Sequence, residues 1–89
     1  MTSSLPALTL LGRNGCHLCE DMRAALKPWT ARFDFSVEEI DIGGKSELEA
    51  RYGWDIPVLM AGETEICRHC LDEGALQSWL AGNVRARKP

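Results

Sequence analysis

The sequence has little of what marks a membrane, nucleic-acid-binding or disulfide-rich protein. No apolar run approaches the length of a transmembrane helix, and no targeting segment stands out. The formal net charge is -3, whereas nucleic-acid-binding domains are usually basic. Four cysteines are too few for a disulfide scaffold. We therefore expect a cytoplasmic protein that binds neither nucleic acid nor a membrane.

Repeats, low-complexity tracts and linkers are absent as well, so nothing divides the chain into parts. Its 89 residues suffice for one domain with a modest core. The 45% of hydrophobic and 26% of charged residues are ordinary for a globular protein. We expect a single, monomeric domain over residues 1–89, with residues 1–6 and 83–89 as flexible ends.

The first half of the chain predicts a strand, a helix and a second strand. Residues 7–12 form a short apolar run that ends in glycine, as buried strands do. Pro28 should kink the helix that follows or end it early. Residues 34–42 alternate as a strand, and the phase slip at Glu38-Glu39 indicates a bulge or a strand that reaches only one side. The helix should bury one apolar stripe, made of Leu18, Met22, Leu26, Trp29 and Phe33.

The second half predicts a short helix, a hairpin and a last helix. Ser46 and Glu49 fit a capping box for a helix that ends at Tyr52. Two runs, residues 57–60 and 64–69, flank Gly62 and predict a hairpin. The last helix should begin after Asp72, which is a suitable N-cap residue. Its inward-facing residues should be Leu76, Trp79 and Leu80.

These elements give the order β-α-β-α-β-β-α. The opening β-α-β unit predicts parallel strands joined by a right-handed crossover, and the closing hairpin adds an antiparallel pair. The expected fold class is α/β, with a mixed four-stranded sheet flanked by three helices.

A C-x-x-C motif, Cys16 and Cys19, lies where the first strand ends and the first helix begins. Stable disulfides are rare in the cytoplasm, so such a motif there is usually catalytic or metal-binding. The same spacing recurs in Cys67 and Cys70. The two pairs are therefore either halves of one metal site or a redox pair with two companions.

Three segments together resemble one known family. They are "TLLGRNGCHLCEDM", "ELEARYGWDIPVL" and "EICRHCLDEGAL", and the resemblance extends over about residues 7–80. They are similar to the glutaredoxin-like family of the thioredoxin superfamily. The resemblance implies a thioredoxin-like fold and a cis peptide bond at Pro57. It also implies that the Ile56 backbone pairs with an extended substrate segment, as in β-augmentation.

The resemblance also implies contacts with glutathione, a possible co-substrate with no cofactor bound to the chain. Arg13 matches a basic position that pairs with a glutathione carboxylate, and Asp72 an acidic position that meets its amino group. The alternatives are a solvated loop charge for Arg13 and a plain N-cap for Asp72. Glutaredoxins carry Gly-Gly before the last helix, whereas this chain has His69 and Cys70, whose bulk opposes a glutathione cleft.

Thiol–disulfide exchange needs a thiolate to attack and a second thiol to resolve the mixed disulfide. Cys16 precedes the helix, whose N-terminus favours an anion, so it is the expected nucleophile. Cys19 lies one turn inward and is the expected resolving thiol. His17 and Arg13, when cationic, should stabilise the thiolate. The expected partners are a disulfide-containing protein or glutathione, together with an external reductant.

For Cys67 and Cys70 three interpretations stay open. They could be a core residue and an incidental loop thiol, since free cysteine packs well as an apolar residue. They could be auxiliary thiols that exchange with Cys16. They could also complete a structural zinc site of four cysteines, or of three cysteines with His69 or His17, although the two pairs would be unusually far apart in sequence. The favoured function is a dithiol–disulfide oxidoreductase without a metal, and the alternative is a non-catalytic binding module or a zinc-binding protein.

Overall fold

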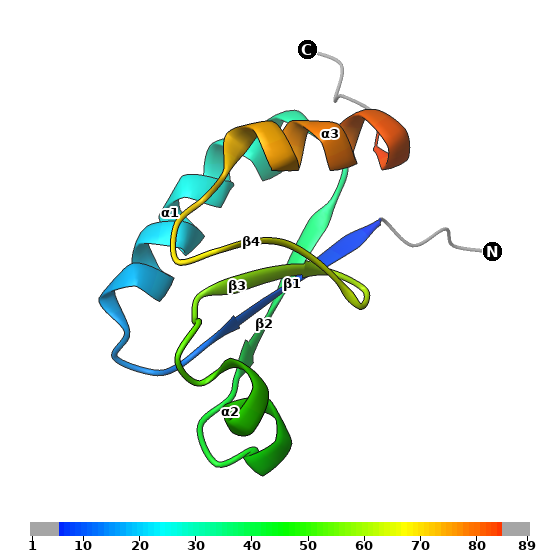
Figure 1. Ribbon diagram of the computed structural model, residues 1–89. Helices are drawn as coiled ribbons and strands as arrows, with labels where there is room; N and C mark the ends of the chain where they lie inside the picture. Colours follow the sequence, from blue (N-terminus) through cyan, green and yellow to red (C-terminus); the bar gives the residue numbers. More distant parts are fainter. Residues whose placement is uncertain (1–5, 85–89) are drawn as a thin grey trace, which may run out of the picture.

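The computed structural model describes residues 6–84 as a sheet with helices on both faces (Figure 1). The elements follow one another as β1 (Ala7–Gly12), α1 (His17–Arg32), β2 (Ser36–Asp41), α2 (Ser46–Tyr52), β3 (Val58–Ala61), β4 (Thr64–Arg68) and α3 (Glu73–Asn83). The strand order is β2-β1-β3-β4. β1 runs parallel to β2 and antiparallel to β3, and β3 is antiparallel to β4. The predicted element order and mixed four-stranded sheet are thus confirmed.

The sheet separates two apolar clusters because its central strands bury both faces. Leu10 and Leu11 are neighbours on β1 and point to opposite faces, so each belongs to a different cluster. Figure 1 shows α1 and α3 together on one side of the sheet and α2 apart from them. The α1/α3 cluster contains Leu8, Leu10, Met22, Leu26, Trp29, Phe35, Leu59, Cys67, Leu76 and Leu80. The cluster beside α2 contains Leu11, Ile42, Val58 and Met60.

The phase slip in the second strand has a different cause from the predicted bulge. β2 pairs with β1 without a register shift from Ser36 to Asp41. Val37 packs against the α1/α3 cluster, whereas Ile40 packs against the cluster beside α2. The strand therefore points apolar side chains to one face in its first half and to the other face in its second half. The prediction of a bulge at Glu38-Glu39 is wrong because an edge strand covered on different faces produces the same pattern.

Two expectations for the first helix, an early end at Pro28 and a buried side chain at Leu18, are also wrong. α1 continues past Pro28 to Arg32, since Pro28 is exposed and the packing of buried Trp29 holds the last turns in place. Leu18 is 50% exposed, and the buried stripe instead begins at Cys19. The spacing from Cys19 through the other buried residues is three and four, which continues one face of the helix.

The helix caps agree with the sequence in one case and differ in the other. Asp72 caps α3, because its carboxylate accepts a hydrogen bond from the Ala75 N–H at 3.1 Å. In α2 the N-cap residue is Lys45, and no side chain caps the helix. The predicted capping box of Ser46 and Glu49 is absent because the helix begins one residue earlier, with Ser46 as its first residue, and the Glu49 carboxylate contacts Arg13 and the Gly44 N–H instead.

The last strand ends one residue earlier than predicted. β4 stops at Arg68, and His69 takes a left-handed conformation with φ 71°. A bulge between Leu59 and Met60 in the β3–β4 register places Glu65 and Arg68 on the same face. The Arg68 guanidinium contacts Glu65 at 2.6 Å. Because His69 is left-handed, the chain turns directly after Arg68 into the segment that leads to α3.

The predicted flexible ends, residues 1–6 and 83–89, fall mostly outside the described residues. Pro6 accepts a hydrogen bond from the Ser36 N–H at 3.0 Å, and Asn83 donates to the Trp79 carbonyl at 2.8 Å. Residues 1–5 and 85–89 lie outside the described residues. Within residues 6–84, no helix is both long and apolar enough to cross a membrane.

Two leucine substitutions test this packing. Leu59 is fully buried on a central strand, so Leu59→Ala should lower the free energy of unfolding by about 2–5 kcal/mol. Leu18→Ala is the matched control, because the same atoms are removed from an exposed helix position, and the change should stay within about 0.5 kcal/mol. Urea unfolding monitored by circular dichroism measures both, and equal losses would contradict the assigned positions.

A second test concerns the left-handed residue that follows β4. At a positive φ a β-branched side chain is strained, whereas glycine is not. We therefore expect His69→Val to be less stable than His69→Gly by about 1–2 kcal/mol. Thermal and urea unfolding of the two variants provides the comparison. Similar stabilities of the two variants would mean that residue 69 does not adopt this conformation.

Candidate redox site

The first cysteine of the C-x-x-C motif is the N-cap of α1. Cys16 follows the turn after β1, and its N–H donates to the Arg13 carbonyl at 3.2 Å. Its Sγ accepts a hydrogen bond from the Cys19 backbone N–H at 3.1 Å. Cys16 is partly exposed. A sulfur at a helix N-terminus that accepts an N–H is in a position that favours the thiolate over the thiol.

The second cysteine lies one turn inside the helix and is buried. Cys19 is only 3% exposed and is joined to Cys16 by a disulfide with a Cα–Cα separation of 5.2 Å. Gly12, the last residue of β1, leaves the room that this sulfur needs. A Cβ atom on Gly12 would lie 3.1 Å from Cys19 Sγ, closer than most Cβ contacts. Of the two sulfurs, an incoming substrate can therefore reach that of Cys16 more easily.

The loop before β3 carries the proline that the resemblance singled out. The Ile56–Pro57 peptide bond is cis, and Pro57 is buried. The Pro57 carbonyl accepts a hydrogen bond from the His69 N–H at 2.7 Å, which ties this loop to the segment after β4. Within residues 6–84, the backbone N–H and C=O of Ile56 have no hydrogen-bond partner. The role of Ile56 and Pro57 in binding a substrate stays a prediction.

The two charged residues expected to contact glutathione both have partners within the chain. Arg13 is exposed in the turn after β1 and forms an ion pair with Glu49 of α2. Asp72 is occupied as the N-cap of α3. His17, the expected modulator of the cysteine, is the exposed first residue of α1. The functional roles of these three residues stay predictions.

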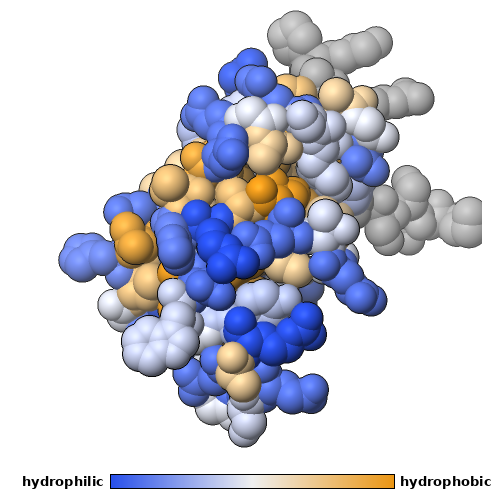
Figure 2. Space-filling model, in the orientation of Figure 1, coloured by the Kyte–Doolittle hydropathy of each residue, from blue (hydrophilic) through white to orange (hydrophobic). Residues whose placement is uncertain are grey.

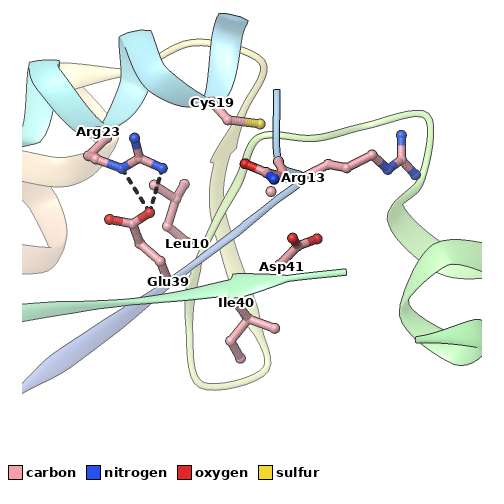
Figure 3. A pocket seen from close by; sticks show the side chains of 9 residues that line it. Leu10, Arg13, Cys19, Arg23, Glu39, Ile40 and Asp41 are labelled. Atoms are coloured by element: carbon pink, nitrogen blue, oxygen red, sulfur yellow. Dashed lines mark hydrogen bonds and ion pairs between the residues drawn. The ribbon is translucent and has the colours of Figure 1, made fainter. Parts of the chain in front are cut away.

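A cavity of about 180 Å³ lies at the carboxyl ends of β1 and β2, and Cys19 lines it (Figure 3). Its other polar lining includes Arg23, Glu39 and Asp41, and Arg23 bonds to Glu39 across it at 2.8 Å. The sequence did not assign these three residues to a functional site. Arg23 follows Cys19 by one helical turn, and Asp41 pairs with Gly12 in the sheet. Once the β-α-β unit is recognised, both residues are therefore expected to lie near Cys19.

The second cysteine pair differs from the first. Cys67 is buried on β4, and Cys70 is exposed in the segment before α3. Burial raises the pKa of the Cys67 thiol, and the Asp72 backbone offsets this only in part. Cys67 belongs to the α1/α3 cluster, which accords with the interpretation as a core residue. The auxiliary role considered for this pair stays a prediction.

The arrangement of metal-binding side chains bears on the zinc alternative. Over residues 6–84, no three His, Cys, Asp or Glu side chains come together closely enough to hold a metal ion. The sulfurs of Cys16 and Cys19 are bonded to each other. In the described part of the chain, Cys16 and Cys19 are therefore bonded to each other and are not grouped with other side chains as metal ligands.

Several solved structures are similar to this chain. Protein Ne2328 from Nitrosomonas europaea is 32% identical, with a TM-score of 0.77 over 89% of this chain and 95% of that one. Target protein XcR50 from X. campestris is 33% identical, with a TM-score of 0.64 over 84% and 96%. Plasmodium falciparum thioredoxin is 10% identical, with a TM-score of 0.62 over 96% of this chain and 77% of that one. This last likeness shows the thioredoxin-like fold alone.

The sequence itself also matches a family, the one described as "Glutaredoxin-like domain (DUF836)", over residues 7–81. This match spans both cysteine pairs, the cis-proline loop and nearly all of α3. Together with the thioredoxin-like fold, it confirms the resemblance stated from the sequence. The chain belongs to the glutaredoxin-like domain family, and its fold is thioredoxin-like.

Proposed function

We propose that the chain is a thiol–disulfide oxidoreductase that works through Cys16 and Cys19. The observation that carries this proposal is the disulfide at the N-terminus of α1, with one sulfur partly exposed and the other buried. Such a pair can accept and give two electrons without rearrangement of the fold. The unpaired peptide groups of Ile56 and the cis peptide bond at Pro57 support the proposal, because they suit an extended substrate.

In the first step, the thiolate of reduced Cys16 attacks one sulfur of a substrate disulfide. The substrate S–S bond breaks, a bond forms between Cys16 Sγ and that sulfur, and the other substrate sulfur leaves as a thiolate that takes a proton from water. The helix N-terminus and the Cys19 N–H stabilise the attacking thiolate.

In the second step, Cys19 loses its proton and attacks Cys16 Sγ. The mixed disulfide breaks, the second substrate thiol leaves, and the Cys16–Cys19 disulfide forms. The substrate gains two electrons, and the cysteine pair loses two. An external thiol or dithiol reductant then restores the reduced pair. We propose the cytoplasm as the compartment, since a reducing environment supplies such reductants.

The two cysteines should respond differently to substitution with serine. Cys16→Ser removes the nucleophile, so reduction of a disulfide substrate should be lost. Cys19→Ser leaves the first step intact and should accumulate a mixed disulfide between Cys16 and the substrate. Substrate thiol release measures the activity, and intact-protein mass spectrometry detects the adduct. Cys70→Ser is the matched control, since it removes an exposed thiol that the proposed cycle does not use. Full activity of Cys16→Ser would refute the proposal.

The free thiols provide a further prediction. In the protein with Cys16 and Cys19 oxidised, a small alkylating reagent should modify exposed Cys70 at least about tenfold faster than buried Cys67. Burial raises the pKa of the Cys67 thiol, so at about pH 8 it stays largely protonated as well as shielded. Peptide mass spectrometry over time gives both rates. Equal rates would contradict the core position of Cys67.

A further inference from the structure

Large exposed hydrophobic side chains occur at two positions within the described residues, one in the C-x-x-C motif and one in the loop that carries the cis proline. Leu18, between the two cysteines in sequence, is 50% exposed, and Trp54 is 96% exposed. Figure 2 shows hydrophobic atoms exposed among hydrophilic ones near the start of α1. Single exposed apolar residues are common on protein surfaces. Here the informative feature is that both belong to segments that the proposed function uses, the C-x-x-C motif and the cis-proline loop.

Trp54 belongs to the same loop as the cis proline and borders the turn before Cys16. It lines a cavity of about 250 Å³ together with Arg13, Glu49 and Gly53. Arg13 lies in the turn that ends at Cys16, as its carbonyl accepts the Cys16 N–H. The indole thus shares a cavity with a residue of the turn that leads to Cys16, while almost all of its surface faces solvent.

The loop that carries Trp54 is held in place by two contacts of Asp55, the residue that follows Trp54. The Asp55 N–H donates to the Tyr52 carbonyl at 2.8 Å, and the Asp55 carboxylate contacts Arg68 at 3.0 Å. The unpaired peptide groups of Ile56 follow directly. A substrate segment that pairs with Ile56 would therefore run beside a positioned aromatic ring.

The charged groups near the site argue against glutathione as the ligand. Glutathione carries two carboxylates and one amino group, so its binding depends on charged partners. Arg13 is already paired with Glu49, and Asp72 is already engaged by the Ala75 N–H. Within residues 6–84, the groups without a protein partner in the C-x-x-C motif and the cis-proline loop include the exposed Leu18 side chain and the peptide unit of Ile56. These recognise an extended protein segment better than a small charged tripeptide.

We propose that the substrate is an extended segment of a disulfide-containing protein with apolar side chains beside its cysteine, docked on Trp54 and Leu18. This inference rests on the proposed function and specifies its substrate. The segment pairs with Ile56, its apolar side chains cover the indole and the leucine, and its sulfur meets Cys16. Trp54 and Leu18 bind the substrate and take no part in the exchange of bonds.

Three disulfide probes test the proposal with the full-length protein. Two are peptides with an internal disulfide that are identical except that leucines flank the cysteines in one and serines in the other. The third is glutathione disulfide. The wild-type protein should reduce the leucine peptide with a kcat/KM about tenfold or more above that for either other probe.

Substitutions then assign the preference to the two side chains. Trp54→Ala should raise KM for the leucine peptide about tenfold with little change in kcat, and Leu18→Ala should act in the same direction. Trp54→Phe should retain most of the affinity, since it keeps an aromatic surface. The serine peptide should be affected less than about twofold by all three. Glu63→Ala, in the exposed β3–β4 turn, is the control.

The outcomes separate this inference from the proposed function. Equal turnover of the leucine and serine peptides, or an unchanged KM in Trp54→Ala, overturns the docking surface while the oxidoreductase stands. A higher kcat/KM for glutathione disulfide than for the leucine peptide also overturns the docking surface, and it would make glutathione the preferred substrate. Failure of the wild-type protein to reduce any of the three probes overturns the proposed function and this inference together.

Discussion

The site depends above all on the close approach of the Cys19 sulfur to Gly12. Gly12 is fixed because β1 pairs regularly with β2 along its whole length. Cys19 is fixed because it begins the buried stripe of α1, whose next members pack into the α1/α3 cluster. A Cβ atom at position 12 would lie only 3.1 Å from Cys19 Sγ, which is closer than most Cβ contacts. The packing of α1 against β1 therefore sets the position of the disulfide. The turn between β1 and α1 connects the two elements.

The remaining parts of the site are held to this frame by contacts between segments that are distant in sequence. The cis-proline loop is tied to the segment after β4 by the hydrogen bond between His69 and Pro57. Asp55 adds an ion pair with Arg68, which the bulge in the hairpin turns toward the same face as Glu65. Exposed ion pairs contribute little to stability. Here they hold the cis-proline loop, in which the peptide unit of Ile56 is unpaired, at the end of the sheet where β1 leads to the cysteines.

The sequence predicted those features that depend on local pattern or family resemblance. Strand and helix order, the N-cap at Asp72 and the α/β sheet followed from periodicity and capping chemistry. The errors have a common origin in tertiary packing. Leu18 falls on a helical repeat but lies one position off the buried stripe, and Pro28 is tolerated because neighbouring Trp29 is buried. The pairing of Arg13 with Glu49 joins residues from two elements, which no local pattern indicates.

The unequal exposure of the two cysteines gives the proposed cycle its order. A substrate sulfur can approach partly exposed Cys16, whereas Cys19 is covered by β1 and α1. The first exchange is therefore between two molecules, and the second takes place within the chain. Because α1 already holds Cys19 within disulfide distance of Cys16, the second step needs no further encounter and benefits from a high effective concentration. Binding of the substrate then matters chiefly for the first step, where the surface around Cys16 decides which disulfides are attacked.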